Sequence, residues 1–132
     1  MRLIFASLCA ASVLLLSTPP ATADSAVPTK HPGCFFANQF ESWKAPDAKT
    51  IYIRVRMHDY YRLDLVSSCP MLLWPSSHLI TEFHGSDTIC SALDWDLKVS
   101  QGTHGSIEPC IVKTMTALTS DEVAAIPKKF KP

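Results

Sequence analysis

Residues 51–65 read IYIRVRMHDYYRLDL, and this stretch decides the fold. Apolar side chains occupy every second position from Ile51 to Val55, and again from Tyr61 to Leu65. A period of two is typical of strands with one buried face and one wet face. The stretch therefore predicts an antiparallel hairpin.

The connection between these two strands follows from the need to bury both apolar rows together. Opposed residues on antiparallel strands share a face, so the numbers of each pair must add to an even value. A two-residue turn at His58-Asp59 would give odd sums and would set Val55 against Arg62. We therefore predict a three-residue loop or a bulge.

The same register predicts a polar outer face on the hairpin. It carries every arginine that follows residue 23, with two tyrosines beside them: Arg54, Arg56, Arg62, Tyr52 and Tyr60. Arginine forks flanked by tyrosines suit carboxylate or phosphate groups, so this is a candidate anion- or partner-binding face. A solvated strand face, partly neutralised by Asp64, is the commoner explanation of such a row.

The rest of the chain predicts a mainly β protein. Alternation continues at Trp95–Val99, and weaker strands are expected at 79–84 and 110–116. Residues 36–43 could form a first strand or a short helix, and we favour the strand. Thr119 and Glu122 form a capping box for a short helix that Pro127 ends. Five or six short strands and one helix predict a small antiparallel barrel or curled sheet with a short C-terminal helix.

The first 23 residues have the pattern of a secretory signal peptide. Arg2 precedes an uncharged stretch from Leu3 to Leu16, and Ala21-Thr22-Ala23 is a cleavage motif, with cutting expected before Asp24. About 14 apolar residues span roughly 21 Å as a helix, which is short of the bilayer core. We expect an exported, periplasmic or secreted protein without a transmembrane segment after cleavage. Residues 24–33 would be a loose lead-in and 34–132 a single β-rich domain.

Cleavage would also change the charge and the cysteine count. The full chain has 12 basic and 12 acidic residues, and loss of Arg2 leaves a net charge of about −1. Such a balance does not favour nucleic acid as a partner. Loss of Cys9 leaves four cysteines, at 34, 69, 90 and 110, which predict two disulfides in an exported domain. Because no C-x-x-C pair exists, we expect no metal site, and no motif indicates a cofactor.

Catalytic signals are weak. Asp94 and Asp96 would lie on one face of a strand, where paired carboxylates could serve a small hydrolase, but an exposed strand face explains them as well. The chain has no G-x-S-x-G elbow and no P-loop. The large aromatic side chains are expected in the core: Phe35, Phe36, Phe40, Trp43, Trp74 and Trp95. We therefore predict that the protein is not an enzyme.

The order of these features resembles a known family. A Pro46-Asp47 turn opens the hairpin with its Tyr61-Arg62-Leu63 segment, and Cys69-Pro70, Ile89-Cys90 and Pro109-Cys110 follow. This arrangement is similar to a family of small exported bacterial proteins known as a domain of unknown function, over nearly all of the mature chain. The resemblance supports the disulfides and implies no catalytic residue. Among the three possible pairings we expect Cys34–Cys110, which would close the sheet, and Cys69–Cys90, which would pin two loops.

These observations favour a non-enzymatic binding or structural module of the bacterial cell envelope. Its partner would be an envelope protein or glycan, and the protein would be a monomer. The alternative is a periplasmic inhibitor of a hydrolase, such as a lysozyme or protease, because a rigid, disulfide-stapled β domain suits that role. An inhibitor would need a protruding loop, for which 78–81 and 102–105 are the candidates. A small hydrolase that uses Asp94 and Asp96 is the least favoured function.

Overall fold

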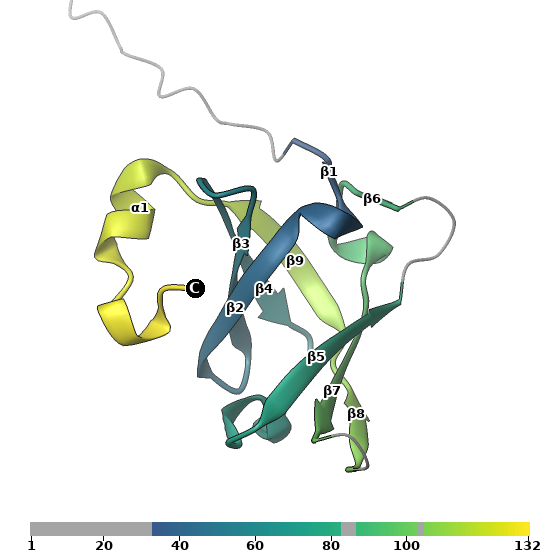
Figure 1. Cartoon of the computed structure of the whole chain (residues 1–132). Helices are drawn as coiled ribbons and strands as arrows, with labels where there is room; N and C mark the ends of the chain where they lie inside the picture. Colours follow the sequence, from purple (N-terminus) through teal and green to yellow (C-terminus); the bar gives the residue numbers. More distant parts are fainter. Residues whose placement is uncertain (1–32, 83–86, 103–104) are drawn as a thin grey trace, which may run out of the picture.

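The computed structural model describes residues 33–82, 87–102 and 105–132. The predicted signal peptide, the lead-in up to residue 32 and three of the five histidines lie outside these ranges. The strands (Figure 1) are β1 (Phe35–Phe36), β2 (Phe40–Asp47), β3 (Thr50–Val55), β4 (Asp59–Leu65), β5 (Ser77–Glu82), β6 (Thr88–Ile89), β7 (Asp96–Gln101), β8 (Ile107–Pro109) and β9 (Val112–Ala117). The helix is α1 (Ser120–Ala125), and the 3₁₀ turns are η1 (Ala37–Gln39), η2 (Pro70–Leu73), η3 (Ala92–Asp94) and η4 (Lys128–Phe130).

The predicted hairpin is confirmed, with its register. In the β3–β4 ladder Ile51 lies opposite Leu63, Ile53 opposite Tyr61, and Val55 opposite Asp59. Residues 56–58 therefore form a three-residue loop, in which Arg56 has a positive φ of 46°. Because every pair adds to an even number, the two apolar rows share one face, and Ile51, Ile53, Val55 and Leu63 are fully buried.

The strands form two larger antiparallel sheets and one short ladder. The orders are β2-β3-β4-β9 and β5-β7-β8, while β1 pairs with β6. The two larger sheets are joined where the chain passes from β8 to β9. The Cys110 N–H donates to the Leu97 carbonyl in β7, and the carbonyl of the following residue, Ile111, accepts from the Val66 N–H beyond β4. One segment thus leaves one sheet and enters the other.

A closed barrel does not form among the described residues. The order of the joined sheets ends at β2 on one side and at β5 on the other, and these two strands do not pair. Of the two predicted architectures, the closed barrel is wrong, and so is the expected number of five or six strands, because the described residues form nine strands in three sheets. The antiparallel β-rich fold with one short helix and two disulfides is confirmed. β2 pairs only with β3 and β5 only with β7 among the described residues, so each leaves one sheet edge open.

The core lies between the two larger sheets. Leu97 and Val99 of β7 and Leu63 of β4 belong to one buried cluster, which also includes Phe35, Trp95 and Met71. The Phe35 ring contacts Tyr61 at 5.1 Å and Trp95 at 6.2 Å between centroids. The prediction that all large aromatic side chains are core is wrong for two of them, because Phe36 is 54% and Trp74 48% exposed.

Two of the weaker predicted elements differ from the structure. The segment predicted as one strand over 36–43 consists of β1, the turn η1 and the start of β2, which continues to Asp47. The expected strand face with Asp94 and Asp96 is also wrong, because Asp94 ends the turn η3 and β7 begins only at Asp96. In both places a short 3₁₀ turn stands where a continuous strand is expected.

The predicted disulfide pairing is wrong. The structure joins Cys34 to Cys90 and Cys69 to Cys110. The expected pairs were Cys34–Cys110 and Cys69–Cys90, and all four of these cysteines lie within the described residues. Strand register explains the first bond, because Phe35 lies opposite Ile89 and so brings their neighbours together. The second bond follows from the β4–β9 ladder, in which Leu65 lies opposite Val112. Two disulfides are typical of proteins in oxidising compartments.

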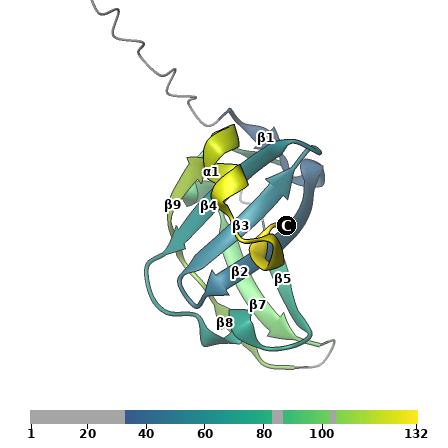
Figure 2. The same ribbon diagram turned by 90° about the vertical axis from the view of Figure 1, so that its left-hand side faces the viewer.

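The C-terminal segment lies against the outer face of the four-stranded sheet (Figures 1 and 2). The Thr119 hydroxyl accepts from the Glu122 N–H, and the Glu122 carboxylate accepts from the Thr119 N–H at 2.8 Å, so the predicted capping box is confirmed. After α1, Ile126 is buried at 7% exposure. No helix of the described residues has the length and apolar character needed to cross a membrane.

The disulfide pairing predicts a specific peptide map. Trypsin alone leaves Cys69 and Cys90 in one peptide between Arg62 and Lys98, whereas additional cleavage after Glu82 separates them. Non-reducing digestion with both specificities should yield one linked pair that contains Cys34 and Cys90 and another that contains Cys69 and Cys110. A linked Cys34–Cys110 pair, identified by mass spectrometry, would contradict this topology.

Candidate functional site

The three arginines of the predicted binding face contact carboxylate or carbonyl groups of the chain itself. Arg54 donates through Nε to the Glu41 carboxylate at 2.9 Å and through a terminal nitrogen to the Pro132 carbonyl at 3.4 Å. Arg62 contacts the Asp64 carboxylate at 2.7 Å. Exposed pairs of this kind contribute little stability, but they occupy the donors that an anionic ligand would need.

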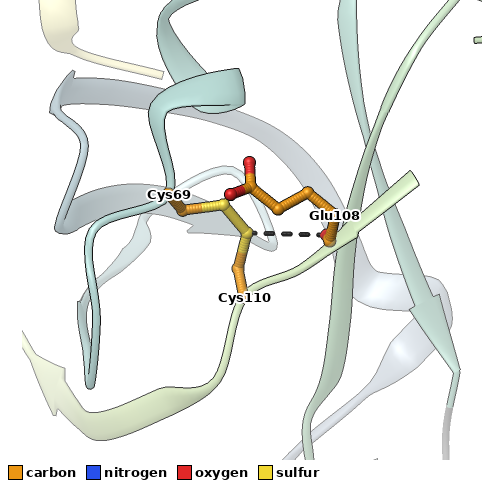
Figure 3. Close-up of side chains that lie close together, drawn as sticks. All are labelled: Cys69, Glu108 and Cys110. Carbon is orange, nitrogen blue, oxygen red and sulfur yellow. Dashed lines mark hydrogen bonds between the residues drawn. A yellow bond between two sulfur atoms is a disulfide. The ribbon is translucent and has the colours of Figure 1, made fainter. Parts of the chain in front are cut away.

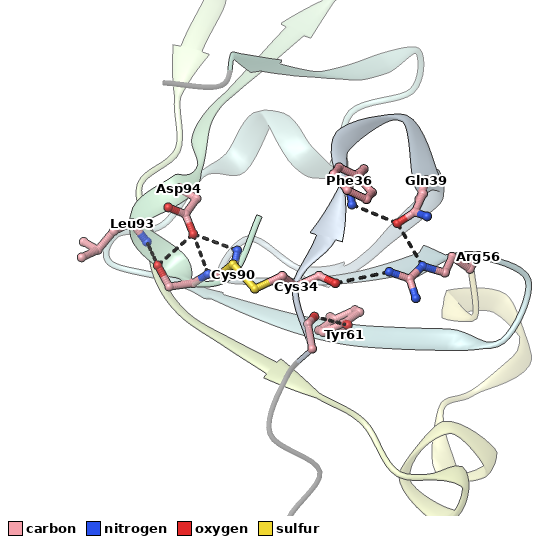
Figure 4. The surroundings of a disulfide bond; sticks show 10 residues. Cys34, Phe36, Gln39, Arg56, Tyr61, Cys90, Leu93 and Asp94 are labelled. Atoms are coloured by element: carbon pink, nitrogen blue, oxygen red, sulfur yellow. Dashed lines mark hydrogen bonds between the residues drawn. A yellow bond between two sulfur atoms is a disulfide. The ribbon is translucent and has the colours of Figure 1, made fainter. Parts of the chain in front are cut away.

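Arg56 does not continue the arginine row. Its positive φ turns the loop, and its side chain donates to the Gln39 amide oxygen at 2.9 Å and to the Cys34 carbonyl at 3.2 Å. Because the Gln39 oxygen also accepts from the Phe36 N–H at 2.9 Å, Arg56 fixes the start of the folded chain to the hairpin. Tyr61 adds a hydrogen bond to the Gly33 carbonyl at 3.0 Å. Figure 4 shows this set of contacts.

The C-terminal segment covers part of the same face. The Lys131 ammonium lies 5.7 Å from the centre of the Tyr60 ring, and the Tyr60 carbonyl accepts from the Leu118 N–H. The Ser42 hydroxyl is the one buried side-chain polar atom of the described residues that lacks a hydrogen-bond partner. The structure therefore does not bring the three arginines and two tyrosines into one open site, and a binding role for them stays a prediction.

Arg62 belongs instead to a polar hollow of about 730 Å³. Its charged lining residues mix both signs: Asp47, Lys49, Arg62, Asp64 and Lys113. The Asp64 carboxylate is shared by Arg62 and by the Thr114 hydroxyl, which donates to it at 3.0 Å. Arg62 and Asp64 contact each other, and the remaining charged lining residues are two lysines and Asp47, so this hollow does not present charge of a single sign.

A second groove of about 470 Å³ lies between the open edge of β2, the turn η2, the start of β5 and the turn η4. Its aromatic lining residues come from three separate segments: Trp43 in β2, Trp74 after η2, and Phe130 in η4. Leu73 and Trp74 are exposed, while Leu72 beneath them is buried. Its volume lies in the range of about 300–1,000 Å³ that ligand sites usually have.

The charged residues of this groove have one sign. Lys44 and Lys129 line it, together with Ser76 and Ser77, and no lining residue is acidic. The Lys129 ammonium lies 4.6 Å from the centre of the Phe130 ring. Neither indole N–H of Trp43 or Trp74 donates to a described residue. Aromatic faces, free indole donors and ammonium groups are thus available to a ligand at one place, which we call the aromatic groove.

One feature of the sequence points to this groove. Trp74 stands between Leu73 and Pro75, in a segment with no alternating pattern to bury it. Trp43 lies on an edge strand, and Phe130 lies after the helix. Since these residues are 31 and 56 positions apart, only the folded chain brings them together.

The two aspartates considered for catalysis have separate structural roles. One Asp94 carboxylate oxygen accepts from the N–H groups of Cys90 and Ser91 at 2.8 and 2.7 Å, and from the Ser91 hydroxyl at 3.1 Å. The backbone donors of Cys90 and Ser91 lower the pKa of Asp94. Asp96 lies 3.5 Å from the Lys98 ammonium. A carboxyl group with a lowered pKa is a poor general acid, so Asp94 is a poor candidate for the proton donor of a hydrolase.

The most compact cluster of metal-ligand side chains is Cys69, Glu108 and Cys110, whose ligand atoms lie within 4.8 Å of one another among the described residues. Figure 3 shows that the two sulfur atoms are bonded to each other. The Cys110 sulfur lies 3.7 Å from the Glu108 carbonyl, and the Glu108 carboxylate accepts from the Met71 N–H at 3.3 Å. A disulfide has no thiolate to offer a metal ion, so this cluster is not a metal site as it stands. The disulfide instead connects two segments at the junction of the sheets.

One of the two segments predicted as protruding inhibitor loops is a strand. Residues 78–81 lie within β5 and pair with β7, so that expectation is wrong, and 103–104 lie outside the described residues. A different segment protrudes: Leu93, in η3, is 92% exposed. Figure 4 shows its side chain pointing away from the Asp94 hydrogen bonds and from the Cys34–Cys90 disulfide.

Comparisons with known proteins give no relative: no protein-family model matches the chain, and neither a curated protein nor a solved structure matches it.

The capping role of Asp94 predicts a pH-dependent contribution to stability. Its pKa in the folded protein is below the ordinary value of 3.8, so its contribution is complete above that value and is lost as the pH falls through the lowered pKa. We expect Asp94→Asn to lower Tm by about 2–5 °C at pH 6. The difference from wild type should shrink toward zero at pH 2, measured by circular dichroism.

Glu122→Gln is a useful comparison for this experiment, since hydrogen bonds from Thr119 lower the pKa of Glu122 in the same way at the other cap. If the Tm difference for Asp94→Asn is the same at pH 2 and pH 6, the carboxylate charge is not what stabilises this turn.

Proposed function

We propose that the protein is a non-enzymatic binding module of the cell envelope that holds a polysaccharide chain in the aromatic groove. The observation that carries this proposal is the exposure of Trp74 at 48%, beside Trp43 and Phe130, in a protein that buries Phe35 and Trp95. Exposed apolar groups that gather at one hollow mark interaction sites, whereas scattered ones do not. The resemblance to a family of small exported proteins stays a prediction and adds no activity.

The lining chemistry supports a sugar more than an apolar ligand. One face of a pyranose ring presents C–H groups that pack against the electron-rich face of an aromatic ring. Its hydroxyl groups need donors and acceptors, which the serine hydroxyls, indole N–H groups and lysines around the aromatic groove supply. Small-molecule sites commonly combine an aromatic lining with a few polar groups in this way.

A peptide strand is a less favourable occupant of the same place. β2 is an edge strand and could add a further strand through its backbone. Its edge carries Lys44 and Pro46, however, and charged side chains and proline are the usual means by which proteins prevent such pairing. Proline also removes one backbone donor from the edge.

Trp74→Ala tests this function. The wild-type protein should bind at least one member of a panel of soluble neutral and acidic polysaccharides, with quenching of tryptophan fluorescence. We expect Trp74→Ala to weaken that binding at least about tenfold, since stacking on an aromatic ring contributes about 1–3 kcal/mol in the comparable case of nucleic-acid bases. Tm should change little because the side chain is half exposed.

Phe36→Ala is the matched control, because Phe36 is an equally exposed aromatic residue in β1, outside the aromatic groove. Equal loss of binding in the two variants, or no binding of any polysaccharide by the wild type, would contradict the proposed function.

A second candidate function, inhibition of an envelope hydrolase, is supported by Leu93. A disulfide and a capping box hold its turn in place, so inserting Leu93 into a pocket would cost little conformational entropy. We expect an inhibitor to reduce lysozyme or protease activity in proportion to its concentration, and Leu93→Asp to abolish the effect while leaving Tm unchanged. If the lysozyme or protease keeps the same residual activity with the wild type and with Leu93→Asp, this candidate function is excluded.

A further inference from the structure

We infer that the ligand of the aromatic groove is an acidic polysaccharide, whose sugar rings stack on the aromatic side chains while its anionic groups contact Lys44 and Lys129. This inference rests on the proposed function and adds the charge class of the ligand. Neither the net charge of the chain nor the predicted arginine face points to this place, because the attraction is local and comes from two lysines far apart in sequence.

Lys44 and Lys129 form no ion pair with any described residue. The lysine ion pairs that the structure contains belong to Lys98, which contacts Glu82 and Asp96 on the other sheet. Both groove lysines are exposed, so their ammonium groups are held neither by a carboxylate nor by burial. This differs from the arginines, each of which contacts an oxygen of the chain within 3 Å.

Neither acidic residue of β2 neutralises the groove, and the first of them, Glu41, contacts Arg54 at 2.9 Å. Asp47 follows Pro46, but its carboxylate accepts from the Lys49 N–H at 2.7 Å and lines the neighbouring polar hollow. The groove lining therefore keeps two positive charges without a compensating carboxylate. A ligand with anionic groups gains favourable interactions with both lysines, whereas a cationic ligand would be repelled.

The positions of the lysines also suit a ligand that stacks. Lys129 lies over the Phe130 ring at 4.6 Å, so its ammonium is at the border between the aromatic surface and solvent. Lys44 neighbours Trp43 along β2, and side chains on a strand alternate between faces, which places the ammonium and the indole on opposite sides of the edge. A chain that crosses this edge can contact a ring and a charge together.

Lysine gives a point charge and not a planar fork, so the site attracts carboxylate, sulfate and phosphate groups without strong discrimination among them. The feature that selects the ligand is the combination of charge with a stackable sugar. Charge alone, as in inorganic polyphosphate, would satisfy the lysines and leave the aromatic side chains without a partner.

The experiment compares ligands that differ only in charge. Binding of oligogalacturonate and of its methyl ester, which has the same sugar backbone without the carboxylates, is measured by isothermal titration calorimetry at 50 and 300 mM NaCl. We expect the acid form to bind at least about tenfold more tightly at 50 mM, with most of that preference lost at 300 mM as salt screens exposed charges. Inorganic polyphosphate serves as the ligand without sugar.

The matched protein variants change charge equally inside and outside the groove. Lys44→Gln combined with Lys129→Gln should lower the affinity for the acid form about five- to tenfold and should leave the affinity for the ester unchanged. Lys49→Gln combined with Lys113→Gln removes the same two charges from the neighbouring polar hollow, and it should leave both affinities within about twofold. Tm of both variants should match wild type because all four side chains are exposed.

The outcomes separate this inference from the proposed function. Equal binding of acid and ester forms, lost in Trp74→Ala and insensitive to salt, would overturn the acidic ligand and leave the polysaccharide site standing. Binding to polyphosphate that matches oligogalacturonate and ignores Trp74→Ala would overturn the requirement for a sugar. If the acid form is bound no more tightly than neutral polysaccharides, the acidic ligand is excluded; if no polysaccharide is bound at all, the proposed function fails as well.

Discussion

The shared face of the β3–β4 hairpin is the constraint on which the rest of this structure depends. Its even register directs Ile51, Ile53 and Leu63 to one side, where they become fully buried. A shift by one residue would place charged side chains there and apolar ones in water. Every other strand joins the fold by covering this apolar face or by extending the sheet beside it. The loop at 56–58 is therefore as important to the fold as the strands.

The passage from β8 to β9 is the second feature that shapes the molecule. The consecutive residues Cys110 and Ile111 form backbone hydrogen bonds with different sheets, so one segment belongs to both. The Cys69–Cys110 disulfide lies at this junction and holds the end of β4 near it. Because the sheets are joined here, the outer edges of β2 and β5, on the opposite side of the two sheets, do not pair with each other. The aromatic groove lies along that open side, so it is a consequence of how the sheets are joined.

The polar outer face of the hairpin shows why residue type alone does not identify a site. Arg54 and Arg56 are the kind of residue that binds anions, but here they connect the hairpin to Glu41 and to the Cys34–Gln39 segment. Nothing in the sequence marks Lys44 and Lys129 as a pair, but in the folded chain both line a groove that has no acidic lining residue. Whether a charged group is available to a ligand depends on its neighbours in space.

The sequence by itself determined the hairpin, its three-residue loop, the mainly β fold and the capped helix, because these depend on alternation and on contacts between residues close along the chain. It could not determine the disulfide pairing, since β1 and β6 are only two residues long and carry no readable pattern. Nor could it determine that Trp74 is exposed while Trp95 is buried. Only the tertiary structure decided these points, because they depend on which segments distant in sequence meet, and local periodicity holds no information about that.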